Sequence, residues 1–163
     1  MQQVSNIEKY FKEFLGYYIP GQIIELGTGD GQFIAIIRNL VKCDIRTFDV
    51  REANVMAEGI IYSDLDVFEN ENVIADMIRS KKTLLLCDDG DKIREVHTFA
   101  KYLDTGDVIM AHDYADNRES FIANKYWRTC ELVLADVEKA LKDFKPFHHD
   151  LMIQSGWMSY QKL

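Results

Sequence analysis

The chain has 163 residues and a net charge of −8, from 27 acidic and 19 basic residues, and 47% of its residues are hydrophobic. This composition excludes a disordered chain, and the length predicts one domain spanning residues 1–163. The sequence has no dense Lys/Arg stripe that could neutralise a phosphate backbone and no apolar run near the roughly 20 residues of a membrane span, so we expect no nucleic acid and no membrane as partner.

Apolar residues in the first half of the chain recur at helical or strand spacing, which predicts alternating elements. An amphipathic helix opens the chain and ends at Pro20-Gly21. Its apolar face carries Ile7, Phe11, Phe14 and Tyr18. The strands predicted next are 22–26, 44–50 and 59–62. The segments predicted after each of them are a helix at 33–41, a short helix or turn at 52–57 and a helix at 70–79.

The second half of the chain continues this alternation. Strand 83–87 is wholly apolar, as expected of a strand buried on both faces of a parallel sheet. A helix at 93–103 and a strand at 108–111 follow it. The polar stretch 114–129 exceeds ordinary loop lengths, so we expect an irregular segment of the kind that often covers an active site. The last predicted elements are a helix at 133–141 and two strands, 147–153 and 157–161, joined by a hairpin turn at 154–156.

The most informative segment begins at the first strand, where IIELGTGDGQF (residues 23–33) runs from an apolar strand through a glycine-rich turn into a helix start. Glycine allows the positive φ angles of such a turn and lets backbone N–H groups approach a ligand. A dinucleotide-binding fingerprint would need a glycine at Gln32, whereas Gly27, Gly29 and Gly31 follow a G-x-G-x-G spacing. Taken alone, the turn is also compatible with a plain strand-to-helix connection.

The second predicted strand supplies a context that favours a cofactor site. It ends in Phe48-Asp49, and Asp49 lies twenty-two residues beyond Gly27. In Rossmann-type units a ribose-binding acid stands roughly 20 residues past the glycines, because strand, helix and strand return the chain beside the first turn. Asp49 is therefore the expected ribose-binding residue.

With Glu25 two residues before the first glycine, this region resembles the first motif of class I S-adenosylmethionine (SAM) dependent methyltransferases. The resemblance implies a three-layer, Rossmann-like α/β fold whose seven-stranded, mostly parallel sheet closes with a C-terminal antiparallel hairpin. It implies SAM as the cofactor, with Asp64 facing the adenine, although an ordinary turn acid is the alternative for Asp64. The expected cofactor-binding residues are Glu25, Gly27, Thr28, Gly29, Gly31, Asp49 and Asp64.

Acidic residues follow the fourth and fifth predicted strands, where ligands bind in open α/β sheets. The fourth strand is followed by Asp88-Asp89-Gly90-Asp91-Lys92 and the fifth by His112-Asp113-Tyr114. Carboxylates gathered at one edge would repel each other unless they are solvated or bound to a cation, so a divalent metal is the economical explanation. Asp88 and Asp91 are set aside because Asp is favoured at turns and helix N-caps.

The segment 84–114 also resembles the cephalosporin hydroxylase-like branch of these methyltransferases, which commonly shows Asp-Gly-Asp-His after strand four and His-Asp after strand five. Metal-dependent O-methyltransferases similar to catechol O-methyltransferase place metal ligands at the same strand ends. The resemblance implies Asp89 and Asp113 as metal ligands, with His112 as a candidate third. Oxygen ligands favour magnesium, whereas a histidine ligand shifts the preference toward manganese or other transition metals.

Lys92 departs from that branch, which usually has His at this position. In the catechol enzymes a lysine at the same offset removes the acceptor proton, and burial beside a metal can lower a lysine pKa enough for this role. The resemblance thus implies Lys92 and Asp89 as the catalytic residues. The alternative is a solvated lysine that bridges the neighbouring acids.

Two further groups of residues keep alternative interpretations. His148 and His149 look like a metal pair, but neighbours on the predicted strand would face opposite sides. Tyr114, Tyr126 and Trp127 are candidates either for an acceptor pocket or for anchors to the core.

The expected activity is transfer of the SAM methyl group to an oxygen of a small hydroxylated acceptor, such as a sugar, polyol or catechol-like molecule, with the assistance of a divalent metal (Mg or Mn). The alternatives are an aminopropyltransferase of the same fold and a non-catalytic SAM-binding protein. The expected partner is a small-molecule acceptor, and homo-oligomerisation stays open. The first residues lack a secretory pattern, so we expect a cytoplasmic protein.

Overall fold

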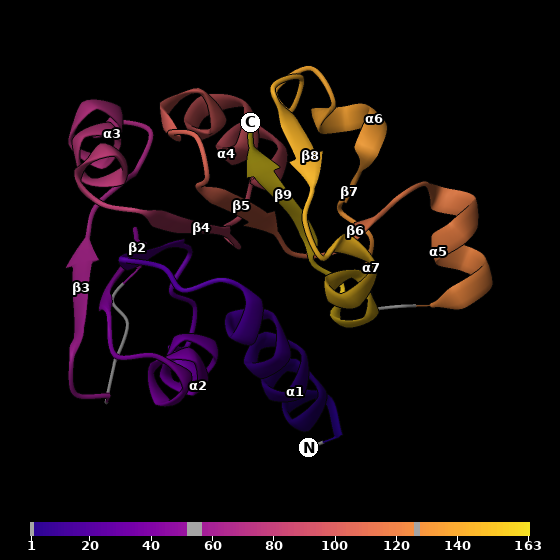
Figure 1. Cartoon of the computed structure of the whole chain (residues 1–163), viewed down its shortest axis with the longest axis horizontal. Coiled ribbons are helices and arrows are strands. Elements are labelled where there is room, and N and C mark those ends of the chain that lie inside the picture. Colours follow the sequence, from indigo (N-terminus) through magenta and orange to yellow (C-terminus); the bar gives the residue numbers. More distant parts are fainter. Residues whose placement is uncertain (1, 52–56, 126–127) are drawn as a thin grey trace.

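A seven-stranded sheet organises the chain in the computed structural model, which describes residues 2–51, 57–125 and 128–163 (Figure 1). Its strand order is β3-β2-β1-β4-β5-β9-β8. β9 runs antiparallel to β5 and to β8, and the other neighbours are parallel. The strands are β1 (Gln22–Leu26), β2 (Asp44–Asp49), β3 (Ile60–Asp64), β4 (Thr83–Cys87), β5 (Val108–Ala111), β8 (Phe144–Pro146) and β9 (Met158–Lys162). The expected seven-stranded, mostly parallel sheet is confirmed.

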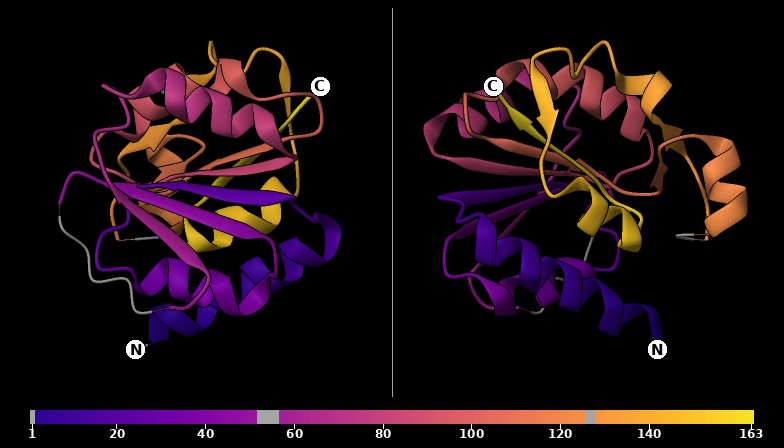
Figure 2. Two further views of the ribbon diagram at one scale, coloured as in Figure 1. Left: turned by 90° about the vertical axis from the view of Figure 1, so that its left-hand side faces the viewer. Right: turned by 45° about the vertical axis from the view of Figure 1, so that its right-hand side comes forward.

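Helices cover both faces of this sheet, so the predicted three-layer α/β fold is confirmed (Figure 2). α1, α2 and α7 lie on one face, α3, α4 and α6 lie on the other, and α5 projects from the body. The helices are α1 (Gln2–Tyr17), α2 (Gln32–Leu40), α3 (Glu71–Ser80), α4 (Lys92–Phe99), α5 (Arg118–Asn124), α6 (Leu134–Val137) and α7 (His149–Met152), with 3-10 turns η1 (Ala100–Tyr102) and η2 (Ile153–Ser155). No helix in the described ranges is long and apolar enough to cross a membrane.

The alternation of side chains along the strands divides the core between the two faces of the sheet. In β4, Leu84 and Leu86 belong to the cluster that packs with α1, α2 and α7, whereas Leu85 and Cys87 belong to the cluster that packs with α3, α4 and α6. All β4 residues are buried, as expected of a parallel strand covered on both faces. Packing on both faces therefore fixes the carboxyl ends of the central strands, where the predicted site residues lie.

The predicted C-terminal hairpin is wrong in its first strand and in its turn. The strand that pairs with β9 is β8, and the apolar run after it forms α7 and η2. Met152 and Ile153 are thus buried side chains of helical turns and not of a strand. A short apolar run is compatible with a helix or a strand, and its packing determines which of them forms. His148 has a φ of 49° at the start of α7, so His148 and His149 begin a helix and are not alternating neighbours on a strand.

The stretch 114–129 is more regular than predicted. It begins with β6 (Tyr114–Ala115), which pairs in parallel with β7 (Leu132–Val133), and it continues into α5. The Asn117 side chain caps α5 by accepting a hydrogen bond from the Ser120 backbone amide at 2.7 Å. None of the residues of α5 is buried, so the sequence has no hydrophobic periodicity that predicts this helix.

The helix predicted at 133–141 is shorter in the structure, because α6 ends at Val137 and turns follow. Residues 52–56 of the predicted turn, together with Tyr126 and Trp127, lie outside the described residues.

Trp157 joins the first two helices to the region before β9. Its ring is 1% exposed, and its centroid lies 5.5 Å from that of Phe11 and 5.1 Å from that of Phe33. We expect Trp157→Ala to lower the free energy of unfolding by about 3–5 kcal/mol, because it leaves a large cavity. Urea denaturation measures the loss against Ile122→Ala, a truncation at a 70% exposed residue that should change stability by less than about 0.5 kcal/mol. Equal effects of the two variants would contradict this packing.

Candidate functional site

The glycine-rich loop between β1 and α2 is anchored to the neighbouring strand β2. The backbone amides of Gly27 and Thr28 both donate to the Phe48 carbonyl oxygen, at 2.8 and 3.1 Å. The Gly31 amide donates to the Thr28 carbonyl oxygen at 2.9 Å, which closes the turn into α2. Gly27, Gly29 and Gly31 all have positive φ angles, so they supply the backbone geometry for which glycine was expected.

Gly27 is required for a second reason, the close approach of another strand end. A Cβ atom at Gly27 would lie 2.5 Å from the Asp88 carbonyl oxygen and 2.6 Å from the Asp89 Cα. A Cβ atom at Gly29 would meet no atom within 4 Å. The loop therefore packs directly on the backbone that follows β4, with Gly29 on its open side.

Asp49 reaches the glycine loop from the end of β2. Its Oδ2 accepts a hydrogen bond from the Gly29 amide at 3.0 Å, and its Oδ1 accepts one from the Arg51 amide at 2.9 Å. Asp49 is 2% exposed, and the exposed Asp64 is its partner in the register of β2 and β3. The structure thus brings the loop and both acids together, and their contact with a cofactor stays a prediction.

Glu25 lies beneath the loop and not on its open side. Its carboxylate accepts a hydrogen bond from the Thr47 hydroxyl, which is also bonded to the Thr28 hydroxyl at 2.7 Å. Burial raises the pKa of Glu25 well above its ordinary value, and the Thr47 hydrogen bond opposes part of that rise. Glu25 and Thr28 therefore hold the loop from below, and a direct contact of either with a cofactor stays a prediction.

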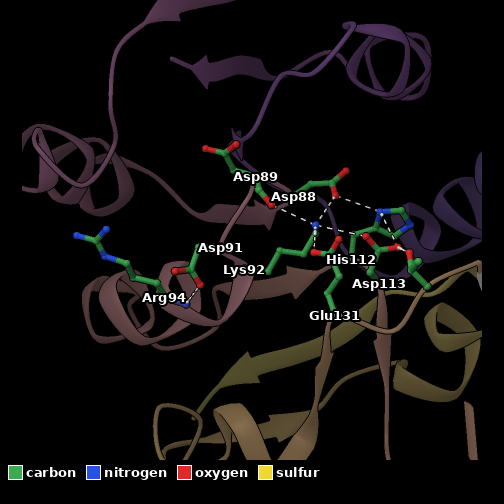
Figure 3. A network of polar contacts seen from close by, with 9 residues as sticks. Asp88, Asp89, Asp91, Lys92, Arg94, His112, Asp113 and Glu131 are labelled. Atoms are coloured by element: carbon green, nitrogen blue, oxygen red, sulfur yellow. Dashed lines mark hydrogen bonds and ion pairs between the residues drawn. The ribbon is translucent and has the colours of Figure 1, made fainter. Parts of the chain in front are cut away.

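The ends of β4 and β5 gather acids around one lysine, Lys92, the first residue of α4 (Figure 3). Its Nζ donates to the Asp89 carbonyl oxygen at 3.1 Å. Three carboxylate oxygens also surround this nitrogen: Glu131 Oε2 at 2.7 Å, Asp113 Oδ2 at 3.3 Å and Asp88 Oδ1 at 3.7 Å. The Lys92 side chain is 6% exposed. Lys92 is thus a buried lysine that bridges the neighbouring acids.

These contacts keep Lys92 protonated. Burial lowers its pKa, but the hydrogen bond to Glu131 and the charges of Asp88 and Asp113 raise it more, so the net shift is upward. The lowered pKa that the sequence analysis expected for a base is absent, because acids surround the ammonium. In this arrangement Lys92 is a cation and not a free amine that could accept a proton.

Asp88, His112 and Asp113 form a group that could hold a metal ion, with ligand atoms within 4.8 Å of one another. The predicted set had Asp89 in the place of Asp88. Asp88 and Asp89 follow the end of β4, and Figure 3 shows the Asp89 carboxylate pointing away from the other acids. Asp88, which the sequence analysis set aside as a turn residue, is therefore the acid that meets His112 and Asp113.

His112 and Asp113 are fixed at the end of β5. His112 Nδ1 lies 3.1 Å from Asp88 Oδ1, and the imidazole ring stacks on Trp157 with centroids 4.7 Å apart. Asp113 has a φ of 58°, a left-handed conformation that costs a non-glycine residue about 1–2 kcal/mol. Its carbonyl oxygen accepts a hydrogen bond from the Glu131 amide at 2.8 Å. This strained corner is therefore tied to the start of β7.

Glu131 is the site residue that sequence reasoning missed. It follows the long polar stretch and lies 39 residues from Lys92, and no motif or spacing marks it. The signal that the sequence does contain is its place directly before the apolar pair Leu132-Val133, which forms β7 beside β6.

Comparison with known proteins identifies the fold. No family model matches this sequence, and no curated protein sequence matches it. Among solved structures, an apo structure of CmcI matches 100% of this chain and 73% of its own, with a TM-score of 0.68 and 16% identity. A structure of CmcI with Mg and SAM covers the same shares, with a TM-score of 0.67 and 15% identity. The N-methyltransferase NodS from Bradyrhizobium japonicum, in complex with S-adenosyl-L-homocysteine, matches 97% of this chain and 86% of its own, with a TM-score of 0.58 and 9% identity.

The chain therefore has the class I SAM-dependent methyltransferase fold, as its glycine motif predicts. The sheet order and the antiparallel last strand agree with this assignment. The identities to CmcI and NodS are 16% or lower, so the likeness extends to the fold and not to individual residues.

Gly27→Ala and Gly29→Ala separate the two reasons for glycine in the loop. At Gly29 the added methyl group has room, so we expect only the cost of a positive φ, about 1–2 kcal/mol of unfolding free energy. At Gly27 the methyl group also overlaps the Asp88 and Asp89 backbone, so we expect a loss above about 3 kcal/mol or failure to fold. Urea denaturation of both variants measures the difference. Equal losses would mean that the loop does not pack on the strand end.

Proposed function

We propose that the protein is a SAM-dependent methyltransferase that methylates an oxygen of a small hydroxylated acceptor, such as a sugar, polyol or catechol-like molecule. The observation that carries this proposal is the Asp49 carboxylate, held 3.0 Å from the Gly29 amide above a loop of positive-φ glycines. In Rossmann-type folds an acid roughly 20 residues past the glycines binds the ribose, and the glycines let the ligand approach the backbone. The neighbours CmcI, solved with SAM, and NodS, solved with S-adenosyl-L-homocysteine, support it.

The cofactor site is built largely before a ligand arrives. Asp49 would accept hydrogen bonds from the ribose hydroxyls, and Asp64 beside it would line the adenine side. The loop from Gly27 to Gly31 would lie against the methionine part, because it carries no side chain at the glycine positions that could block a close approach. Glu25 beneath the loop keeps it in place, which lowers the ordering cost of binding.

The acceptor chemistry needs a group that takes a proton. SAM supplies an electrophilic methyl group, and its sulfur keeps the electron pair of the bond that breaks. The acceptor oxygen forms the new O–C bond and loses its proton. We assign that proton to the Asp89 carboxylate. Its backbone lies against the glycine loop, and among the described residues its carboxylate has no hydrogen bond or ion pair. Positioning of the two reacting atoms supplies much of the acceleration.

Assistance by Mg or Mn, which the sequence resemblance implied, does not fit this cluster as arranged. Asp88, His112 and Asp113 lie close enough for one ion, and CmcI was solved with Mg. The Lys92 ammonium, however, lies 3.3 Å from Asp113 Oδ2 and 3.7 Å from Asp88 Oδ1. An ammonium and a divalent ion at the same two carboxylates repel each other, so the proposed reaction has no step through a metal.

Asp49→Ala tests the cofactor site, and Asp44→Ala is its matched control at the other end of β2. We expect the natural protein to bind SAM and S-adenosylhomocysteine. Asp49→Ala should weaken the affinity for both ligands by about 10–100-fold, because charge-assisted hydrogen bonds are lost. Asp44 is exposed beside Lys81, so its loss should leave affinity unchanged. Calorimetry measures the dissociation constants of both ligands. Absence of heat with either ligand on the natural protein would overturn the proposed function.

Asp89→Asn tests the proton acceptor. We expect kcat to fall by about 10²–10⁴-fold while SAM affinity is retained, because the amide cannot take the acceptor proton. Asp91→Asn is the control: Asp91 caps α4 by accepting a hydrogen bond from the Arg94 amide at 3.0 Å, and Asn caps as well. The measurement is release of S-adenosylhomocysteine from SAM with a panel of sugars, polyols and catechols.

The outcome of that panel also separates the rival functions. SAM binding without turnover on any acceptor would favour a non-catalytic SAM-binding protein. Transfer of an aminopropyl group in place of a methyl group, in a parallel assay with decarboxylated SAM, would favour an aminopropyltransferase.

A further inference from the structure

Lys92 differs from lysines that pair with acids on the surface. Its side chain is 6% exposed, whereas the side chains of Lys81 and Lys101, which also form ion pairs, are 49% and 59% exposed. Burying an ammonium is unfavourable unless acids compensate the charge. Asp88, Asp113 and Glu131 do so from the ends of β4 and β5 and from the residue before β7. The fold therefore builds a cation into this edge of the sheet.

The ammonium pairs with two of the three residues of the candidate metal group. Asp88 and Asp113 belong to both sets. His112, the third candidate ligand, already has its Nδ1 3.1 Å from Asp88 Oδ1. An ion bound to these two carboxylates would lie close to the Lys92 ammonium, and repulsion between two cations is strong where water is largely excluded. The cluster therefore accommodates either the ammonium or a divalent ion.

The contacts of Lys92 hold the ammonium in that position. Nζ donates to Glu131 Oε2 at 2.7 Å and to the Asp89 carbonyl oxygen at 3.1 Å. Lys92 also begins α4, whose first turn is fixed by the Asp91 cap. Moving the ammonium into solvent would break both hydrogen bonds and leave Asp113, which is 8% exposed, without a counter-charge. Figure 3 shows the nitrogen between the acids, with the Lys92 stem directed into the cluster.

We infer that Lys92 is a built-in cation that takes the position of a divalent ion at the ends of β4 and β5, so that the protein binds no divalent ion there and its methyl transfer requires none. Lys92 acts as a positioning residue in this inference, because it holds the β5 end and the start of β7 together and touches neither reactant. The absence of a divalent ion follows from the geometry alone, whereas a reaction without a metal rests on the proposed function.

Mn²⁺ binding to the full chain tests the inference, by calorimetry and by electron paramagnetic resonance. The variants are Lys92→Met, which removes the charge and keeps an apolar stem, and the double variant Lys92→Met with Asp113→Asn. We expect no specific site in the natural protein. Lys92→Met should gain one site that binds Mn²⁺ about tenfold or more tightly than the natural protein does, because the acids lose their counter-charge. The double variant should lose that site.

The change in Tm on addition of Mn²⁺ is a second readout, which a merely structural role of Lys92 would not move. Lys92→Met should have a lower Tm than the natural protein, and Mn²⁺ should raise its Tm but not that of the double variant, since an ion stabilises only a folded state that binds it. Lys101→Met is the matched control. It removes an exposed lysine from its pair with Glu71, and it should create no Mn²⁺ site.

The inference is overturned if the natural protein binds one Mn²⁺ that Asp113→Asn abolishes, or if Lys92→Met folds and gains no site. Should Lys92→Met fail to fold, the natural protein and Asp113→Asn still decide the question. The reaction is tested separately in excess EDTA, where turnover should be unchanged, and loss of turnover restored by Mg²⁺ would contradict it. Failure to bind SAM would overturn the proposed function and leave the ion-binding result intact.

Discussion

The close approach between the β1–α2 loop and the backbone after β4 is the constraint on which the site depends. A Cβ atom at Gly27 would overlap Asp88 and Asp89, so only glycine lets the loop lie there. The positive φ of Gly27 also favours glycine at this position. The loop is also bonded to Phe48 at the end of β2. Three strand ends therefore meet at one point, and Asp49 and Asp89 lie on either side of the loop as a consequence.

This convergence concentrates negative charge, and the fold compensates it in two ways. Glu25 is buried with a raised pKa beneath the loop, where Thr47 donates a hydrogen bond to it. Asp88 and Asp113 face the Lys92 ammonium. Because Lys92 is buried, little water screens its charge, and its attraction to the two carboxylates is stronger. Asp89 points away from that lysine (Figure 3). Among the described residues its carboxylate has no hydrogen bond or ion pair, and its backbone lies against the glycine loop.

The central part of the fold could be predicted because its strands are short apolar runs between clear turns. β1, β4 and β5 agree with the predicted ranges residue for residue. The C-terminal part could not, since the run that forms α7 and η2 is apolar enough for either a strand or a helix, and packing beside α1 decided it. α5 escaped prediction because none of its residues is buried, which leaves its Asn117 cap as the main signal.

By itself the sequence determined the order of strand, glycine turn and helix, the spacing that brings Asp49 to the loop, and the acids at the ends of two neighbouring strands, because these are local patterns with a fixed geometry. Only the tertiary structure decided that Asp88 and not Asp89 faces Asp113, and that Glu131 completes the surroundings of Lys92. Side-chain direction after a strand end and contact across 39 residues depend on how distant segments pack, and no short pattern in the chain encodes that.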